Sequence, residues 1–285
     1  YFVGLLGEAL VASGQDAEGE QLLLRALRLA DQMQYRMYRR RWRLALAAYT
    51  ARNSRYEEAR NYYQQALELF GKRPPTPEHI EALCMASQVS LNLGYTGEAL
   101  DYAKQAHAMS ADLNLESVLA QGALGMALRA SSQNTEALPY LETAAQAVER
   151  ADSTMPAAVR VNILRSLAAV QAETQPDTEL PAATYKRAIT LAQKLNVRLE
   201  EAQSQRDLGL LYASRKMLTQ ALQAWNAALT IYQDEHYTAQ VARLYCDMGN
   251  ARKTLGQGQR AMKDYEQALT LLNSISDQDT RGVVL

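Results

Sequence analysis

Residues 208–228 read LGLLYASRKMLTQALQAWNAA, and this stretch decides the fold. It opens with an apolar residue and a glycine, and Ala221, Trp225 and Ala228 follow. Offsets of four and seven residues lie on one face of a helix. Small residues on that face let two helices approach closely, while the tryptophan fills the space beside them. The stretch therefore predicts an antiparallel pair of helices joined by a short turn.

The same pattern recurs along the whole chain. Its first small residue, here called the anchor, lies at Gly19, Ala59, Ala99, Ala137, Pro181, Ala221 and Ala261. Successive anchors are roughly 40 residues apart, and the interval before Pro181 is the longest. Twelve residues before the anchors lie only small residues: Gly7, Ala47, Ser87, Gly125, Ala169, Gly209 and Gly249. Because this position was not used to find the register, its agreement indicates a real repeat.

A single helical hairpin cannot cover both of its faces, so neighbouring hairpins must stack. The sequence predicts an all-α fold, a right-handed α-α superhelix (solenoid) of about seven antiparallel helical hairpins. We expect one superhelical domain over residues 1–285. The first helix of each hairpin, the A helix, should line a concave groove, and the second, the B helix, should lie outside.

Three irregularities accompany the repeat. The fifth copy is the weakest, with Pro181 as its anchor, and its extra residues lie either in the turn at 175–179 or within 151–156. Neither end of the chain shows the polar cap that solenoids usually need, so we expect a part of a longer protein. Apolar open ends would also allow two copies of the chain to associate.

These residues resemble the tetratricopeptide repeat family, whose A helix carries an apolar residue before Gly and whose B helix carries Ala, an aromatic residue and Ala. Repeats six and seven match best, and the resemblance covers essentially the whole chain. The family period is about 34 residues, whereas here it is roughly 40, and the proline that commonly ends the B helix is absent. The longer version is similar to kinesin light chains, Pins-like adaptors, bacterial Rap-type regulators and the sensor arms of signalling ATPases. The resemblance implies binding of peptides, partner proteins or regulatory ligands.

Composition excludes several classes of function. Thirty Lys and Arg balance 31 Asp and Glu, whereas a nucleic-acid binder usually carries a basic excess. No apolar run is long enough to span a membrane. The two cysteines, Cys84 and Cys246, are far apart, which argues against a disulfide framework and favours a reducing, cytoplasmic location.

The sequence shows no enzymatic signature. His79, His107 and His236 are isolated, so no plausible zinc cluster or acid–base pair emerges. Cys84 and Cys246 fall on separate repeats, which argues against a shared metal site. We therefore predict a protein without catalytic activity and without a metal or cofactor.

The predicted groove changes character along the chain. By family analogy and helix period, groove positions in the first four repeats are mostly small and apolar, as at Leu44, Ala48 and Met126. In repeats six and seven they are polar and basic. The functional interpretation is a cationic pocket for an acidic peptide or a C-terminal carboxylate, and the alternative is ordinary solvated side chains. The pocket would comprise Gln203, Arg206, Arg243, Asn250 and Lys253.

A second basic patch lies near the start of the second repeat. It consists of Arg36, Arg39, Arg40, Arg41 and Arg43, with interleaved aromatic residues. Such a patch could bind phosphates or an acidic protein surface. We favour the alternative, the solvated outer face of a helix start with Trp42 packed between repeats, because neighbouring repeats have no comparable strip.

The leading functional hypothesis is a protein-interaction scaffold or adaptor that binds a partner peptide or protein in its groove. The alternative is the regulatory arm of a multidomain signalling protein, joined to an ATPase, a protease or a transcription regulator. The fold alone does not choose between them.

Overall fold

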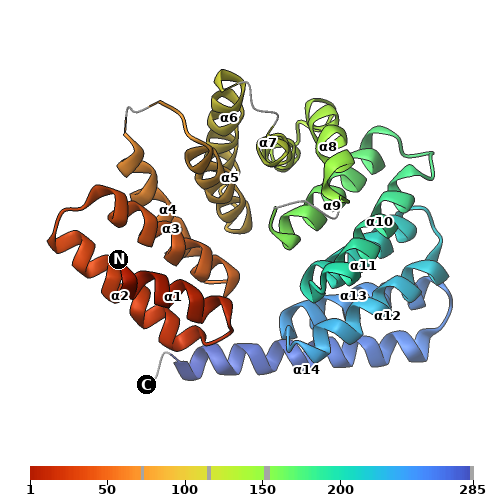
Figure 1. Cartoon of the computed structure of the whole chain (residues 1–285). Coiled ribbons are helices and arrows are strands. Elements are labelled where there is room, and N and C mark those ends of the chain that lie inside the picture. Colours follow the sequence, from red (N-terminus) through yellow and green to blue (C-terminus); the bar gives the residue numbers. More distant parts are fainter. Residues whose placement is uncertain (72–73, 114–116, 151–154, 283–285) are drawn as a thin grey trace. The chain divides into compact units, whose positions relative to one another are not determined.

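The computed structural model describes residues 1–71, 74–113, 117–150 and 155–282, with side chains as far as residue 274. Every regular element in these residues is an α-helix (Figure 1). The helices are α1 (Phe2–Ala12), α2 (Asp16–Gln32), α3 (Arg36–Arg52), α4 (Tyr56–Phe70), α5 (Pro77–Asn92), α6 (Thr96–Asp112), α7 (Val118–Ala130), α8 (Asn134–Val148), α9 (Ala157–Thr174), α10 (Leu180–Leu195), α11 (Arg198–Ser214), α12 (Leu218–Asp234), α13 (Thr238–Thr254) and α14 (Gly258–Gly282).

The helices pack in the order of the chain. The most extensive contacts join the two helices of one hairpin, such as α3 with α4 and α13 with α14. Each hairpin then continues through its B helix into the next A helix, as where α4 packs on α5 and α12 packs on α13. The predicted all-α helical repeat fold is thereby confirmed.

The chain forms two compact units, which are described separately. Unit 1 comprises Tyr1–Ala144 and contains α1 to α7 with most of α8, and unit 2 comprises Ala145–Leu285. Within each unit some A helices also pack directly on one another, as α5 on α7 and α9 on α11. A single domain over residues 1–285 and a right-handed superhelix remain predictions.

The small residues of the repeat lie where the two helices of a hairpin approach each other. All seven anchors are buried, and so is each alanine seven residues later. A Cβ atom added at Gly209 would overlap the indole ring of Trp225, and one added at Gly125 would overlap Leu141. The pattern in the sequence therefore records the close contact between A and B helices.

The fifth repeat departs from this register because its hairpin turn is longer. Five residues, 175–179, separate α9 from α10, whereas three residues, 215–217, separate α11 from α12. Two of the extra residues therefore lie in this turn, and part of the other candidate segment, 151–154, is outside the described residues. The longer turn also explains why Ala169 is half-buried, while the other six residues at its position are buried.

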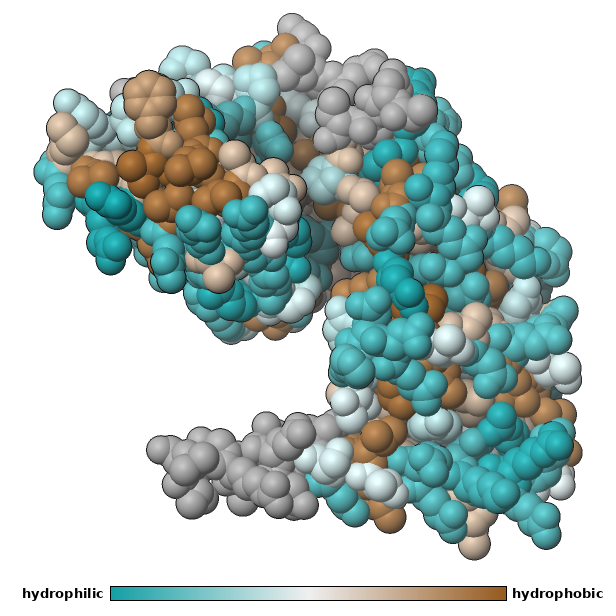
Figure 2. Space-filling view, turned by 60° about the horizontal axis from the view of Figure 1, so that its bottom comes forward, coloured by the Kyte–Doolittle hydropathy of each residue, from teal (hydrophilic) through white to brown (hydrophobic). Residues whose placement is uncertain are grey.

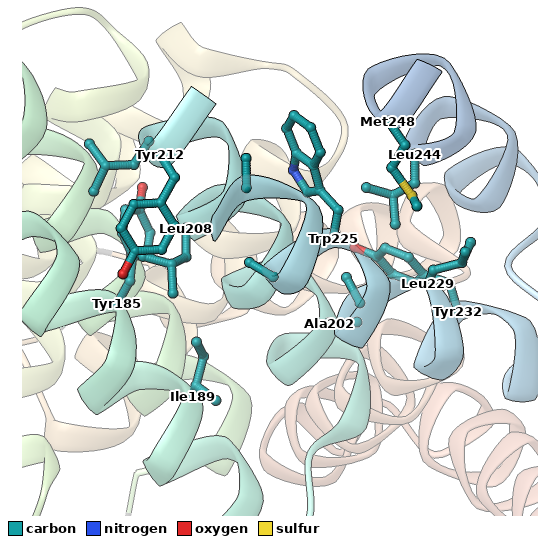
Figure 3. Packing of buried hydrophobic residues seen from close by; sticks show 14 of the residues in the cluster. Tyr185, Ile189, Ala202, Leu208, Tyr212, Trp225, Leu229, Tyr232, Leu244 and Met248 are labelled. Atoms are coloured by element: carbon teal, nitrogen blue, oxygen red, sulfur yellow. The ribbon is translucent and has the colours of Figure 1, made fainter. Parts of the chain in front are cut away.

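Large apolar side chains fill the junctions between repeats. Between the first two repeats, Leu27 of α2 shares a cluster with Trp42 and Leu46 of α3. Between the last two, Tyr232 of α12 shares a cluster with Leu244 of α13 (Figure 3). Complete burial of one such side chain stabilises the fold by about 1.5–3 kcal/mol. These junctions hold each unit together as a stack.

Candidate functional site

The predicted pocket residues lie on two A helices of unit 2. Gln203 and Arg206 belong to α11 and are half-buried, whereas Arg243, Asn250 and Lys253 belong to α13 and are exposed. We call the surface formed by α9, α11 and α13 the A-helix face of unit 2. Within this face α9 packs on α11, and α11 and α13 are one period of the repeat apart in the sequence.

Arg206 lies between two acidic side chains. It forms an ion pair with the neighbouring Asp207, with Nη1 to Oδ1 at 3.4 Å. Its charge also acts on Asp247 of α13. The Nε atom of Arg206 is buried and has no hydrogen-bond partner among the described residues. Arg206 therefore interacts with acidic groups of the protein itself. It is less available to bind a partner than its position in the sequence predicts.

Asp247 is a residue of this face that the sequence analysis missed. Burial raises the pKa of its carboxyl above the usual range, and the charges of Arg206 and Arg243 only partly offset this rise. Its Oδ2 atom is buried without a hydrogen bond among the described residues. A carboxylate in this state is poorly satisfied, because a desolvated charge without hydrogen bonds is unfavourable.

Arg165 of α9 extends the row of charges. Its Nε atom lies 3.0 Å from Oδ2 of Asp207, and it donates hydrogen bonds to the side-chain oxygens of Asn162 and Gln203. Basic and acidic groups thus alternate over three helices. We call this row the charge ladder. It consists of Arg165, Asp207, Arg206, Asp247 and Arg243. With three cations and two anions, its formal net charge is +1.

The exposed residues of the predicted pocket differ in their availability. The amide oxygen of Asn250 accepts a hydrogen bond of 2.8 Å from the Tyr265 hydroxyl. Lys253 is exposed and forms no ion pair with a described residue. Arg243 acts on Asp247 through its charge and forms no ion pair or hydrogen bond within the part of the chain that the structure describes. The cations that remain accessible to a ligand are therefore Arg243 and Lys253.

The two aspartates of the ladder could have been predicted from the sequence. Asp207 and Asp247 are one period apart and so occupy the same position in consecutive repeats. Neither aspartate lies at the offsets predicted to line the groove, but each one directly follows such a position in the sequence.

The corresponding helices of unit 1 present a different surface. Leu44 is half-buried and Ala48 exposed, while Met126 is buried. Cys84 is also buried, and its burial raises the pKa of the thiol to about 12, which leaves it an unreactive thiol. This region is apolar, as predicted, but much of it is already filled by its own side chains.

The second basic patch is engaged within unit 1. Arg39 and Arg43 both pair with Asp31 of α2, at 2.8 and 3.1 Å. Arg40 pairs with Glu78 at 2.6 Å, and Arg41 pairs with Glu8 at 2.8 Å. Each arginine of the patch thus has a partner outside α3, since Arg36 donates a 2.7 Å hydrogen bond to the carbonyl of Leu69. The patch therefore joins neighbouring helices, a role that neither the binding interpretation nor the solvated-face interpretation included.

The described residues contain no group of three or more His, Cys, Asp and Glu side chains placed to hold a metal ion. The two cysteines are not joined to each other. None of the described helices combines the length and hydrophobicity needed to cross a membrane.

Comparison with known proteins agrees with the repeat. The model of the tetratricopeptide repeat family matches residues 242–271, which comprise most of α13 and the first part of α14. No curated protein sequence matches the chain. The predicted resemblance to tetratricopeptide repeats is confirmed by this match together with the fold.

Several solved structures share the fold. The apo form of RapI has a TM-score of 0.70 at 13% identity, with 97% of this chain and 98% of that chain covered. The Rap conjugation gene regulator of plasmid pLS20, in complex with the Phr* peptide, has a TM-score of 0.63 at 12% identity, with 97% of this chain and 74% of that chain covered. The structure of the APC/C hetero-tetramer Cut9-Hcn1 has a TM-score of 0.67 at 18% identity, with 94% of this chain and 45% of that chain covered. At these identities the similarity shows the fold, an α-helical repeat, and goes no further.

Proposed function

We propose that the protein is a non-enzymatic interaction module that binds a partner peptide or protein on the A-helix face of unit 2. The observation that carries this proposal is the charge ladder. Its basic and acidic groups alternate, two of its polar atoms are buried without hydrogen bonds to any described residue, and an exposed cation, Arg243, lies at its end. Buried polar atoms without hydrogen bonds are uncommon in native proteins, and a role in binding at the adjoining surface is one explanation for them.

The chemistry of the face favours a partner with an acidic group. Arg243 and Lys253 are accessible on the same helix, and an arginine can hold a carboxylate through two hydrogen bonds. The aspartates of the ladder limit the excess of positive charge, so we expect one or two carboxylates in the partner rather than a long acidic run.

The similar structures support a peptide as the partner. One of them, the Rap conjugation gene regulator of plasmid pLS20, is in complex with the Phr* peptide. The same fold therefore has a member that holds a peptide. Because that protein is a gene regulator, it also favours, as second candidate, a regulatory arm of a signalling protein. We further propose a cytoplasmic location, on the grounds of the two unpaired cysteines.

The test is binding of the purified chain to a peptide library containing acidic and neutral sequences, at two salt concentrations. The variant is Arg243→Ala/Lys253→Ala, and the matched control is Lys186→Ala/Lys194→Ala, which removes two exposed cations of α10. We expect salt-sensitive binding of acidic peptides, weakened at least about tenfold in the variant and unchanged in the control.

Peptide binding that is equal in the variant and the control would overturn the assignment of this face. The absence of any peptide binding would overturn the peptide proposal as well. It would leave the regulatory arm, whose partner is the rest of its own protein.

A further inference from the structure

Asp207 and Asp247 occupy the same position in consecutive A helices, but their surroundings differ. The Asp207 carboxyl lies 3.0 Å from Nε of Arg165 on the preceding A helix and 3.4 Å from Nη1 of Arg206. The Asp247 carboxyl forms no ion pair or hydrogen bond within the described part of the chain, and its Oδ2 atom is buried. The repeat thus places an acidic group at residue 247 without the basic partner that residue 207 has.

The charges that act on Asp247 come from two arginines, Arg206 of α11 and Arg243 of α13. The helices α12 and α14 also pack on α13, but no charge of their described residues acts on this carboxyl. Burial outweighs the two arginines and raises the pKa of Asp247 above its usual range. The ionised carboxylate is therefore stabilised only in part, because a half-buried charge without hydrogen bonds is unfavourable.

Arg243 is the exposed cation with which the proposed partner would interact. It lies one helical turn before Asp247 on the same helix, and side chains at this spacing are neighbours on a helix surface. A partner carboxylate on Arg243 would therefore bring a second negative charge close to Asp247. Two acidic groups that share a site disfavour each other's ionisation. Asp247 can remove this repulsion by accepting a proton.

Polar groups predominate on the visible side of unit 2. Figure 2 shows mostly hydrophilic residues there, at the lower right of the view. The predicted pocket residues are also polar or charged without exception: Gln203, Arg206, Arg243, Asn250 and Lys253. On such a surface, charge complementarity has a large share in selecting the partner. The ionisation state of Asp247 therefore bears directly on binding.

We propose that Asp247 takes up a proton when an acidic partner binds, and that its ionised form competes with the partner for Arg243. The inference rests on the proposed function, because it concerns the acidic partner of the same face. The proton comes from solution and adds to a carboxylate oxygen of Asp247, and no other bond forms or breaks. Asp247 is thus a residue that determines specificity, since it weakens the binding of an acidic group for as long as it is ionised.

The direction of the pH dependence follows from linkage. A partner that favours the protonated form of Asp247 binds more tightly as the pH falls through the pKa of this carboxyl. The carboxylates of the partner titrate in the same pH range. The effect of Asp247 is therefore the difference between the wild type and Asp247→Asn, to which the partner contributes equally.

The test uses the acidic peptide that binds most tightly in the library. Isothermal titration calorimetry in two buffers of different ionisation enthalpy measures the protons taken up on binding, from about pH 7 to about pH 5. We expect the wild type to take up more protons than Asp247→Asn. At neutral pH, Asp247→Asn should bind the peptide at least about threefold more tightly than the wild type, and this advantage should shrink on acidification.

Glu200→Gln is the matched control. Burial also raises the pKa of the Glu200 carboxyl on α11, but the cation that acts on it is Arg165 and not Arg243. This variant should keep the proton uptake of the wild type, and circular dichroism checks that both variants remain folded. Peptide binding with equal proton uptake in the wild type and Asp247→Asn overturns the inference and leaves the proposed function intact. The absence of binding by every acidic peptide overturns both.

Discussion

Both units carry arginines on their A helices, and in both units some of them pair with acidic residues of a neighbouring repeat, as Arg165 pairs with Asp207 at 3.0 Å in unit 2. The units differ at Arg206 and Asp247. In unit 1 the arginines reach acidic residues of neighbouring repeats, as Arg41 reaches Glu8 and Arg60 of the B helix α4 reaches Glu98, at 2.8 and 2.6 Å. In unit 2 the ladder arginine Arg206 has only a long contact to its neighbour Asp207, and Asp247 has a buried oxygen without a hydrogen bond among the described residues.

This difference shows that the number of basic residues in a segment does not identify a binding surface. The five arginines at 36–43 form the densest basic segment of the chain, yet the structure gives each of them a partner within the protein. One of them, Arg40, still has a buried Nε atom without a hydrogen bond among the described residues, as Arg206 has in unit 2. What distinguishes the row of charges in unit 2 is that an oxygen of an acidic group, Asp247, is also left without a hydrogen bond among the described residues. Satisfied ion pairs join repeats, whereas unsatisfied groups are candidates for recognition.

The largest expected effect concerns the stability of each unit. The chain has two tryptophans, and both are buried, Trp42 in unit 1 and Trp225 in unit 2. Replacing either tryptophan by Ala should destabilise its own unit by about 3–5 kcal/mol, because the lost side chain leaves a large cavity in the packed core. In each variant the remaining tryptophan reports on the other unit by its fluorescence during urea unfolding.

In Trp42→Ala we expect the loss of helix, followed by circular dichroism, to begin at a lower urea concentration than the change in Trp225 fluorescence. Trp225→Ala should show the same order with Trp42 as the reporter. Coincident transitions in both variants would contradict this expectation and show that the two units unfold as one.

The fold could be predicted from the sequence because its main contacts recur at fixed spacing. Gly209 and Trp225 lie within one hairpin, so their pattern is visible in a short window and is repeated seven times. The candidate site was predicted only in part. The acidic partner of Arg165, Asp207, comes from the next repeat, and the same aspartate is the sequence neighbour of Arg206. A list of basic residues does not contain the aspartates that neutralise them.

A smaller effect is expected from Glu98, the acidic partner of Arg60. The Arg60 guanidinium holds the pKa of the Glu98 carboxyl below its usual range, and Ser90 donates a further hydrogen bond of 3.1 Å. Glu98→Gln should destabilise unit 1 by about 1–2 kcal/mol at neutral pH. A lowered pKa means that this stabilisation is present above the unfolded pKa and is lost as the pH falls through the folded pKa.

The difference between wild type and Glu98→Gln should therefore shrink below the ordinary glutamate pKa of about 4.5. This difference in the free energy of unfolding is measured by urea unfolding. Trp42 fluorescence reports on unit 1 in the Trp225→Phe background. Glu68→Gln, at an exposed position of α4, is the matched control and should leave stability unchanged. A difference that persists at low pH would mean that the charge of Glu98 is not its cause.

The smallest effect, and one of opposite sign, is expected from Asp247 in unit 2. Its pKa is raised by burial, so the fold favours the protonated carboxyl. That contribution is fully present below the unfolded pKa, near 3.8, and is lost as the pH rises through the folded pKa. Asp247→Asn should therefore raise the stability of unit 2 at neutral pH, by up to about 0.5 kcal/mol, and the gain should vanish on acidification.

The matched variant is Asp207→Asn, at the same position one repeat earlier. Asp207 pairs with Arg165 at 3.0 Å, so its replacement should lower the stability of unit 2 at neutral pH instead of raising it. Both are followed by Trp225 fluorescence in the Trp42→Phe background. Equal destabilisation by the two variants would mean that Asp247 is as well satisfied as Asp207. It would then remove the main physical difference between the charge ladder and the paired arginines of unit 1.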